Sequence, residues 1–529
     1  MFMKNNIIIV FVLAILLVFS ACSDYFDVVS QDKVTAENNY TKEIDAIAAI
    51  NGLYALMQDL VDPLWLIGET RGELTLPARG ADKYMFDLSM NQARPDNPYT
   101  DYAKFYRLIN SCNGAIEGLT HLQDINQDYN EDVMKVDVAE VMAIRAWTYY
   151  KVAQIWGDAP YFTNFISTSD KIATVRAIPC DSIIYFAAKD MEYARSKTTA
   201  NYANRGQFNF YSMSYFLAEM NVWLGKYTEA REAIYSFVPS TPGWELRMEK
   251  YYKNYWVDQF SPSKLNTTAQ YSWMQYIRFD ANRQQKHNIL RWTNNKNDGI
   301  YAFKPSAISI QRWNIQPQMN QDTYNYYTSD NDYLALPNGL VGDIWRGNYR
   351  SYYIDGKDTL IYKYLINSNL GVDDRKESYK NDMDFCIVRD AQYCLLLAEI
   401  NNRLGKPDEA LRYVNGKTWP GAQPAGYGVR PRVRLMPVIL RAYTTAKVDS
   451  VIADERGMEL AFEGNRWFDL VRMAKTSNNP ALLADRIATK YPAAQQAAIR
   501  TRLMDAKNWY LPYNERNIKC NSTLVQKLY

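Results

Sequence analysis

Apolar residues recur at steps of three or four along several long segments, the spacing of one helical face. The clearest example runs from about Glu131 to Trp156 and stops at the turn sequence Gly157-Asp-Ala-Pro160. Similar patterns predict helices over residues 42–60, 101–119, 182–195, 448–473 and roughly 480–504. Few segments alternate as strands do. The pattern therefore predicts an all-α fold with minor β-hairpins.

A helical segment occurs twice in the chain. Leu217–Ala230 and Leu397–Ala410 are identical at nine of fourteen positions. In each copy a glycine, Gly225 or Gly405, fits the left-handed cap that ends a helix, and Pro407 suits the first turn of a following helix. The segments predict tetratricopeptide-like helix pairs, separated by long irregular insertions because the copies are 180 residues apart.

The N-terminus carries a different apolar pattern. Lys4 precedes thirteen uncharged apolar residues, 7–19, and two small residues lead to Cys22. This is the layout of a secretory signal peptide, and it is shorter than the ~20 apolar residues that a membrane-spanning helix needs. A cysteine at this point resembles a bacterial lipobox, in which the thiol is acylated and the cysteine becomes the first mature residue. We therefore predict a lipoprotein signal peptide over residues 1–21 and lipidation of Cys22. The alternative is an ordinary signal peptide that ends near a cysteine.

Composition narrows the possible functions. The 529-residue chain has a net charge of +2 and no basic run, so no nucleic-acid partner is indicated. Its two histidines make a His-dependent triad or a multi-histidine metal site improbable. We expect no cofactor. Oxygen ligands near Asp322, Asp330 and Asp332 leave structural calcium open, but their spacing does not fit an EF-hand and favours a solvated loop.

Aromatic residues are abundant, with 42 Tyr and 13 Trp. Residues 244–353 hold six of the Trp and thirteen of the Tyr among many Asn, Gln, Asp and Ser, with poor helical periodicity. Flat aromatic faces beside amides and arginines suit the recognition of sugars, although core packing is the common alternative for a Trp. The residues that we predict as ligand-binding candidates are Trp65, Arg71, Tyr84, Trp273, Trp292, Asn294, Trp313, Tyr326 and Trp345.

A dense charged motif lies near the C-terminus. Its members are Glu455, Arg456, Glu459, Glu463, Arg466, Asp469 and Arg472. Carboxylates in such a cluster could in principle act as a general acid and base. Ion pairing within and between helices is the interpretation that we favour. The spacing resembles the signature E-R-x-x-E-L-x-x-E-G-x-R-x-x-D-L-x-R of the SusD/RagB family, and weaker matches extend over nearly the whole mature chain.

The resemblance implies a surface lipoprotein of the Gram-negative outer membrane. Such a protein captures oligosaccharides, or in some members peptides, and delivers them to a SusC-like TonB-dependent transporter. It implies no enzymatic activity, and a SusD-like N-terminal region over residues 22–240 followed by a RagB/SusD C-terminal region over 241–529. Two other hypotheses stay open: a surface glycoside hydrolase or peptidase, and a tetratricopeptide-type structural adaptor.

Overall fold

Helices form most of the described chain. The computed structural model describes residues 40–168, 171, 174–199, 206–236, 273–296, 298–319, 341–364, 383–416, 428–433 and 435–526. Cys22, Tyr326 and the aspartates of the possible calcium loop lie outside these residues. Helices joined by few and short strand pairs confirm the predicted all-α class.

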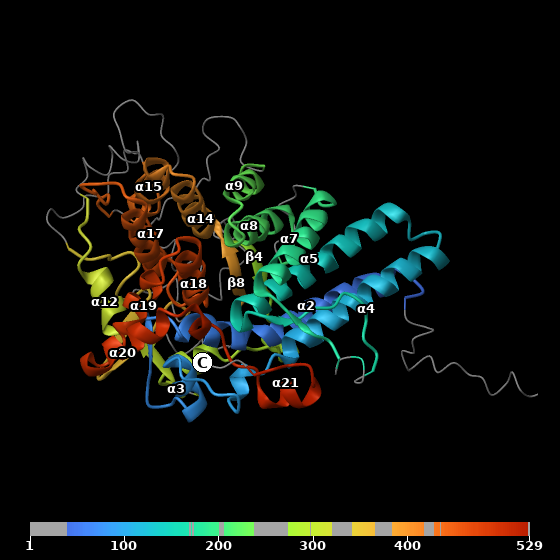
Figure 1. Ribbon diagram of the computed structural model, residues 1–529, viewed down its shortest axis with the longest axis horizontal. Coiled ribbons are helices and arrows are strands. Elements are labelled where there is room, and N and C mark those ends of the chain that lie inside the picture. The colour runs from blue at the N-terminus through green and yellow to red at the C-terminus, as the bar shows by residue number, and fades with distance from the viewer. Residues whose placement is uncertain are drawn as a thin grey trace, which may run out of the picture.

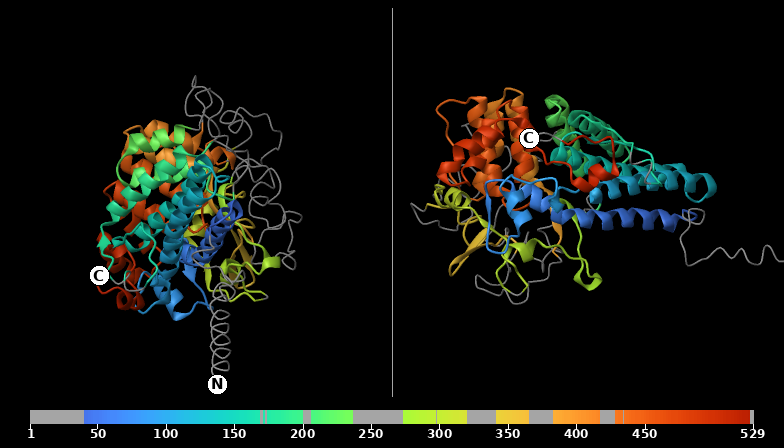
Figure 2. Two further views of the ribbon diagram at one scale, coloured as in Figure 1. Left: turned by 90° about the vertical axis from the view of Figure 1, so that its right-hand side faces the viewer. Right: turned by 60° about the horizontal axis from the view of Figure 1, so that its bottom comes forward.

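The first half of the chain packs long helices side by side. In Figure 1, α2, α4 and α5 extend together to one side, with α7 and α8 against α5, and the right-hand view of Figure 2 shows the same projection. Each predicted helix of this half is present within a few residues. The helices are α2 Glu43–Trp65, the π-helical turn η1 Leu66–Thr70, α3 Lys83–Ser89, the short 3-10 turn η2 Pro98–Thr100, α4 Ala103–Ile125, α5 Glu131–Trp156, α7 Cys180–Ser196, α8 Phe210–Trp223 and α9 Tyr227–Tyr235.

Two isoleucines near the start of α2 are exposed. Ile44 and Ile47 are exposed, whereas Ala46, Ile50 and Leu53 face the core. The continuous stretch 43–70 is long and apolar enough to cross a membrane by length and composition. Its later residues pack in the protein core instead, as Leu60 and Trp65 show.

The second half contains shorter helices. They are η4 Ala281–Arg283, α11 Ile289–Thr293, α12 Ala307–Asn314, α14 Asp390–Arg403, α15 Pro407–Asn415, α16 Val429–Arg432, α17 Thr445–Glu459, α18 Arg466–Thr476, α19 Ala481–Ala488, α20 Ala493–Leu503, η5 Ala506–Trp509 and α21 Glu515–Cys520. Two long predicted helices are therefore each broken in two. The segment 448–473 breaks where Phe462 and Gly464 take positive φ angles of 67° and 81°, and the segment 480–504 breaks before Pro492.

The repeated segment forms the predicted helix pairs. The first copy spans α8 and α9, and the second spans α14 and α15. Gly225 and Gly405 both have φ +74°, the left-handed conformation that a glycine cap supplies, and Pro407 is the first residue of α15. The two pairs also pack on each other through α9 and α14. The tetratricopeptide-like prediction is confirmed.

In the described residues, strands occur as four antiparallel pairs. They are β1 Thr75–Pro77 with β5 Phe303–Pro305, β2 Ala159–Pro160 with β3 Ala177–Ile178, β4 Trp273–Ile277 with β8 Phe385–Arg389, and β6 Tyr352–Asp355 with β7 Asp358–Ile361. Among these four pairs, β6 and β7 form a tight hairpin. The β1–β5 and β4–β8 pairs tie the aromatic-rich segment to distant parts of the helical scaffold, and this holds the candidate site in place.

Candidate functional site

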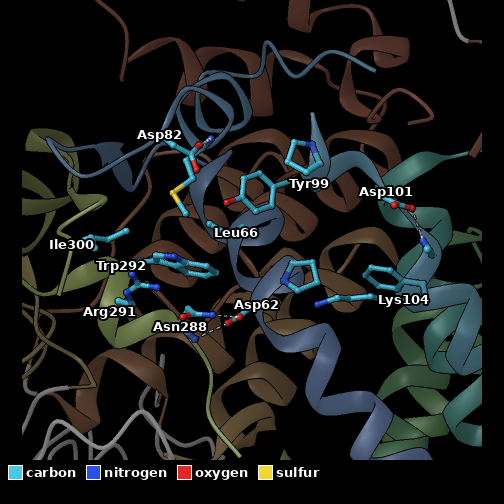
Figure 3. A pocket seen from close by; sticks show the side chains of 15 residues that line it. Asp62, Leu66, Asp82, Tyr99, Asp101, Lys104, Asn288, Arg291, Trp292 and Ile300 are labelled. Atoms are coloured by element: carbon cyan, nitrogen blue, oxygen red, sulfur yellow. Dashed lines mark hydrogen bonds between the residues drawn. The ribbon is translucent and has the colours of Figure 1, made fainter. Parts of the chain in front are cut away.

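A cavity of about 570 Å³, which we call the first cavity, opens where α2 ends. Its walls come from the last turn of α2, from α3 and η2, from the start of α4, and from the segment around α11 (Figure 3). Segments more than 180 residues apart in sequence thus converge on one hollow. Irregular segments positioned by a rigid scaffold are common places for ligand binding.

One wall of the first cavity is aromatic. Trp292 of α11 lines it, and its ring stacks on Trp65 with centroids 5.9 Å apart and planes inclined by 30°. Trp65 is fully buried, and its indole N–H donates to the carbonyl oxygen of Phe462 at 2.8 Å. Trp65 therefore fixes Trp292 from behind, and Trp292 is the ring that reaches the cavity.

Polar groups face this wall. The Asp62 carboxylate accepts hydrogen bonds from the backbone N–H of Asn288 at 2.8 Å and from its side-chain amide at 2.6 Å (Figure 3). Burial raises the pKa of Tyr99 to about 12, and the negative charges of Asp82 and Asp62 add to the rise. The phenol of Tyr99 is therefore neutral near pH 7 and keeps its proton as a hydrogen-bond donor.

Charged side chains complete the rim. Arg291 and Lys104 are exposed and line the cavity together with Asp82 and Asp101. A flat ring among donors and acceptors of both charge signs suits a neutral, hydroxyl-rich ligand. The arrangement offers such a ligand one surface for stacking and several groups for hydrogen bonding.

Most of the predicted ligand residues lie elsewhere. Trp65 and Trp313 are fully buried, and Trp313 stacks on Tyr352, so a role as exposed platforms is contradicted. Asn294 is buried, and its side chain hydrogen-bonds to the backbone of Lys296, two residues away. Trp313 and Asn294 are predicted from the polar residues around them in sequence, and Trp65 from the family resemblance of the early region, yet long-range packing covers all three.

The remaining candidates divide among other places. Arg71 is buried, with its guanidinium 3.8 Å from the Trp467 ring centroid, and it lines a second cavity. Tyr84 and Trp345 are half-buried and do not line the first cavity. Trp273 begins β4, but its side chain is outside the described part, as is Tyr326.

Sequence reasoning missed several lining residues. No sequence motif connects these residues, which are Asp62, Tyr99, Lys104, Asn288 and Arg291. Asp62 and Tyr99 do bound a polar, aromatic segment that resembles the larger insertion in composition, which was the one available signal. The pairing of Asp62 with Asn288 depends on the tertiary fold and leaves no local pattern.

The charged motif lies behind this site and is buried throughout. Glu455 and Glu459 both accept from Arg346, at 2.7 and 2.9 Å, while Arg389 reaches Glu459 at 2.8 Å and Glu463 at 2.8 Å. These partners come from the central part of the chain. The motif therefore joins α17 to the segment before α14.

The arginines of the motif reach in other directions. Arg466 pairs with Glu73, next to η1. Arg472 pairs with Glu399 of α14 at 2.9 Å and with Glu219 of α8 at 2.5 Å, so it joins both copies of the repeat. Asp469 accepts from Arg456 at 2.5 Å. Buried, mutually compensating pairs of this kind are what a structural role requires.

Metal-ligating residues do not gather in the part of the chain that the structure describes. No group of three or more His, Cys, Asp or Glu side chains there could hold a metal ion. Cys112, Cys180 and Cys386 are buried free thiols, Cys394 is also buried, and Cys520 is exposed.

The family models and the curated relatives that match this chain agree on one family. Residues 240–529 match the model described as the SusD family, and residues 24–238 match one described as "Starch-binding associating with outer membrane". The chain is 24% identical to SusD-like protein P38 of Formosa agariphila, over 89% of this chain and 92% of the relative.

Solved structures share the fold. A SusD superfamily protein from Bacteroides thetaiotaomicron matches with a TM-score of 0.65 at 20% identity, covering 92% of this chain and 98% of that one. A structure titled "Laminarin binding SusD-like protein" matches with a TM-score of 0.61 at 15% identity, covering 92% and 99%. With one family model matching more than half of its residues, the chain belongs to the SusD family.

Proposed function

We propose that this protein is a lipid-anchored, cell-surface binding protein of the outer membrane. It captures oligosaccharides and delivers them to a SusC-like TonB-dependent transporter. The observation that carries the proposal is the first cavity, where Trp292 is held by Trp65 and faced by Tyr99 and Asp62. The laminarin-binding relative and the outer-membrane description of the N-terminal family model support it.

A binding role accounts for the polar groups better than catalysis does. Asp62 is engaged by two hydrogen bonds from Asn288, and Asp82 caps α3 by accepting from the backbone N–H of Met85 at 2.7 Å. Asp101, the third lining carboxylate, accepts from the backbone N–H of Ala103 at 2.9 Å and from the side-chain amide of Asn517 at 2.8 Å, so all three carboxylates hold the walls. A glycoside hydrolase needs two carboxyl groups free to act across the scissile bond. Incubation with a bound glycan should release no product, and product release would favour the hydrolase hypothesis.

Replacing Trp292 with Ala should weaken glycan binding at least roughly tenfold, because a buried aromatic anchor often supplies 2 kcal/mol or more. The ligand is first identified by applying glycan and peptide arrays to the protein. Calorimetry with the best glycan then measures the dissociation constant per folded molecule, with the folded fraction taken from thermal unfolding.

The matched control for this variant is Trp223→Ala. Trp223 is equally buried, at 2% exposed, but it lies at the end of α8 and bonds to Asp181 away from the first cavity. Both variants lose a core tryptophan, and only Trp292→Ala should lose affinity. Equal affinities for the two folded variants would exclude the first cavity as the glycan site. Binding to peptides alone would replace the glycan with a peptide ligand.

Replacing Cys22 with Ala should abolish retention in the membrane while folding and ligand affinity stay unchanged. Two or more acyl chains give stable anchoring, and the variant has none. Fractionation of cells that lack the partner transporter measures the effect. A variant that stays membrane-bound there would contradict the lipid anchor.

The adaptor hypothesis has a different expected result: the protein would capture soluble proteins in place of glycan.

A further inference from the structure

A second cavity, of about 450 Å³, is lined by residues 91–95 and by residues near the C-terminal end of the chain. Arg71, Arg94 and Arg502 all line it, and we call it the arginine cavity. The other polar lining residues are amides and a tyrosine. Among the described residues that line it, none is acidic. Three positive charges without a lining carboxylate create a strong field for an anion, since a concave wall of one sign focuses the potential.

The deepest of the three guanidiniums is held in place. Arg71 is 2% exposed, and its Nε donates to the side-chain oxygen of Asn91 at 2.9 Å. The amide of Asn91 donates in return to the carbonyl oxygen of Arg71 at 3.2 Å. The face of the guanidinium lies over Trp467. A side chain that is fixed by two contacts, on a backbone held by a third, loses little entropy when it binds a ligand.

The charge of Arg502 is felt close to that of Arg71. Burial raises the pKa of Tyr491 to about 12, and the positive charges of Arg502 and Arg71 both oppose that rise. The fields of the two arginines thus overlap near one hydroxyl. Arg94 and Arg502 are exposed, so an anion can reach them from solvent.

We propose that the arginine cavity binds an oxyanion, a carboxylate or a sulfate, through Arg71, Arg94 and Arg502. Guanidinium groups pair with such groups through two parallel hydrogen bonds. The cavity is larger than a free inorganic ion requires and is of the size that holds a small organic ligand. An acidic sugar and free inorganic sulfate are the two sources of this chemistry. The proposal does not depend on glycan binding in the first cavity.

Calorimetry on the full chain separates these sources, with glucuronic acid, inorganic sulfate and glucose as probes. The test variant is Arg94→Gln combined with Arg502→Gln, which keeps the buried Arg71 and therefore the fold. The control is Arg107→Gln combined with Arg283→Gln, which removes two exposed arginines that do not line the arginine cavity. Thermal unfolding confirms that both variants fold.

We expect glucuronic acid to bind at least tenfold more tightly than glucose, and the test variant to lose at least tenfold while the control and Trp292→Ala do not. If sulfate binds, loses affinity in the same variants, and glucuronic acid does not bind, the cavity is assigned to a free inorganic anion. If neither glucuronic acid nor sulfate binds, the proposal is overturned. The proposal is also overturned if the test and control variants lose affinity equally. It is overturned as well if Trp292→Ala is the variant that loses affinity, because that result would place the anion in the first cavity.

Discussion

Replacing Glu463 with Gln is expected to lower the free energy of unfolding by about 3–5 kcal/mol, the usual cost of breaking a buried ion pair. Glu463 is 2% exposed and accepts from Lys363 and from Arg389, at 2.9 Å to Nε. Both cations are fully buried, and Gln leaves them without their common negative partner. Urea unfolding of the two proteins measures the difference.

The control for Glu463→Gln is Asp485→Asn. Asp485 pairs with Arg500 at 2.5 Å, but about half of each side chain is exposed. Water screens this pair, so its removal should cost less than about 1 kcal/mol. Glycan affinity per folded molecule should survive in both variants, because neither residue lines the first cavity. Unchanged stability in Glu463→Gln would contradict a structural role for the motif.

The effect of Glu463 should also depend on pH. Burial acts to raise the pKa of its carboxyl, but Arg389 and Lys363 together hold that pKa below its usual value of 4.5. In the unfolded chain the carboxyl takes up a proton near that value, while in the folded protein it stays ionised to lower pH. Its stabilising contribution is thus complete above about pH 4.5 and falls as the pH drops further. The difference between wild type and Glu463→Gln should shrink in acid.

How far the sequence predicts this molecule depends on the range of the interactions. Helix periodicity and capping glycines are local, and they place α5 at its observed ends and the helix pairs at Gly225 and Gly405. The break after Glu459 was not predicted, because the motif reads as one continuous helix. The break exists because distant groups hold the turn: the Glu69 carboxylate accepts from the backbone N–H groups of Phe462 and Gly464, at 2.9 and 3.0 Å.

In the candidate site, too, the features that the sequence does not predict depend on long-range interactions. Trp292 is predicted from its polar sequence neighbours and Trp65 from the family resemblance of the early region, yet only Trp292 faces the cavity. Their stacking and the bond from Trp65 to Phe462 involve residues that are hundreds of positions apart. No local pattern decides which ring is covered. The family motif thus supports the site from behind, through the turn that holds Trp65.

Replacing Gly68 with Ala should destabilise the protein by about 3 kcal/mol, at the upper end of the usual cost of overpacking a core. A Cβ on Gly68 would lie 1.9 Å from the carbonyl oxygen of Gly464 and 2.6 Å from the ring of Phe468. The first atom belongs to the backbone of the turn after α17, so no side-chain rotation relieves the clash. Urea unfolding measures the loss.

Gly52→Ala is the matched control, because it makes the same change in the same run of helix. Gly52 lies in α2, and a Cβ there meets nothing within 4 Å. Ala favours a helix over Gly by roughly 0.5–1 kcal/mol, so this variant should gain stability. Gly68→Ala must also displace the turn that accepts the Trp65 hydrogen bond. We therefore expect it alone to weaken glycan binding per folded molecule, since Trp65 positions Trp292. If the two variants were equally stable, η1 and the turn after α17 could move apart to make room for the added methyl group, which would contradict the prediction.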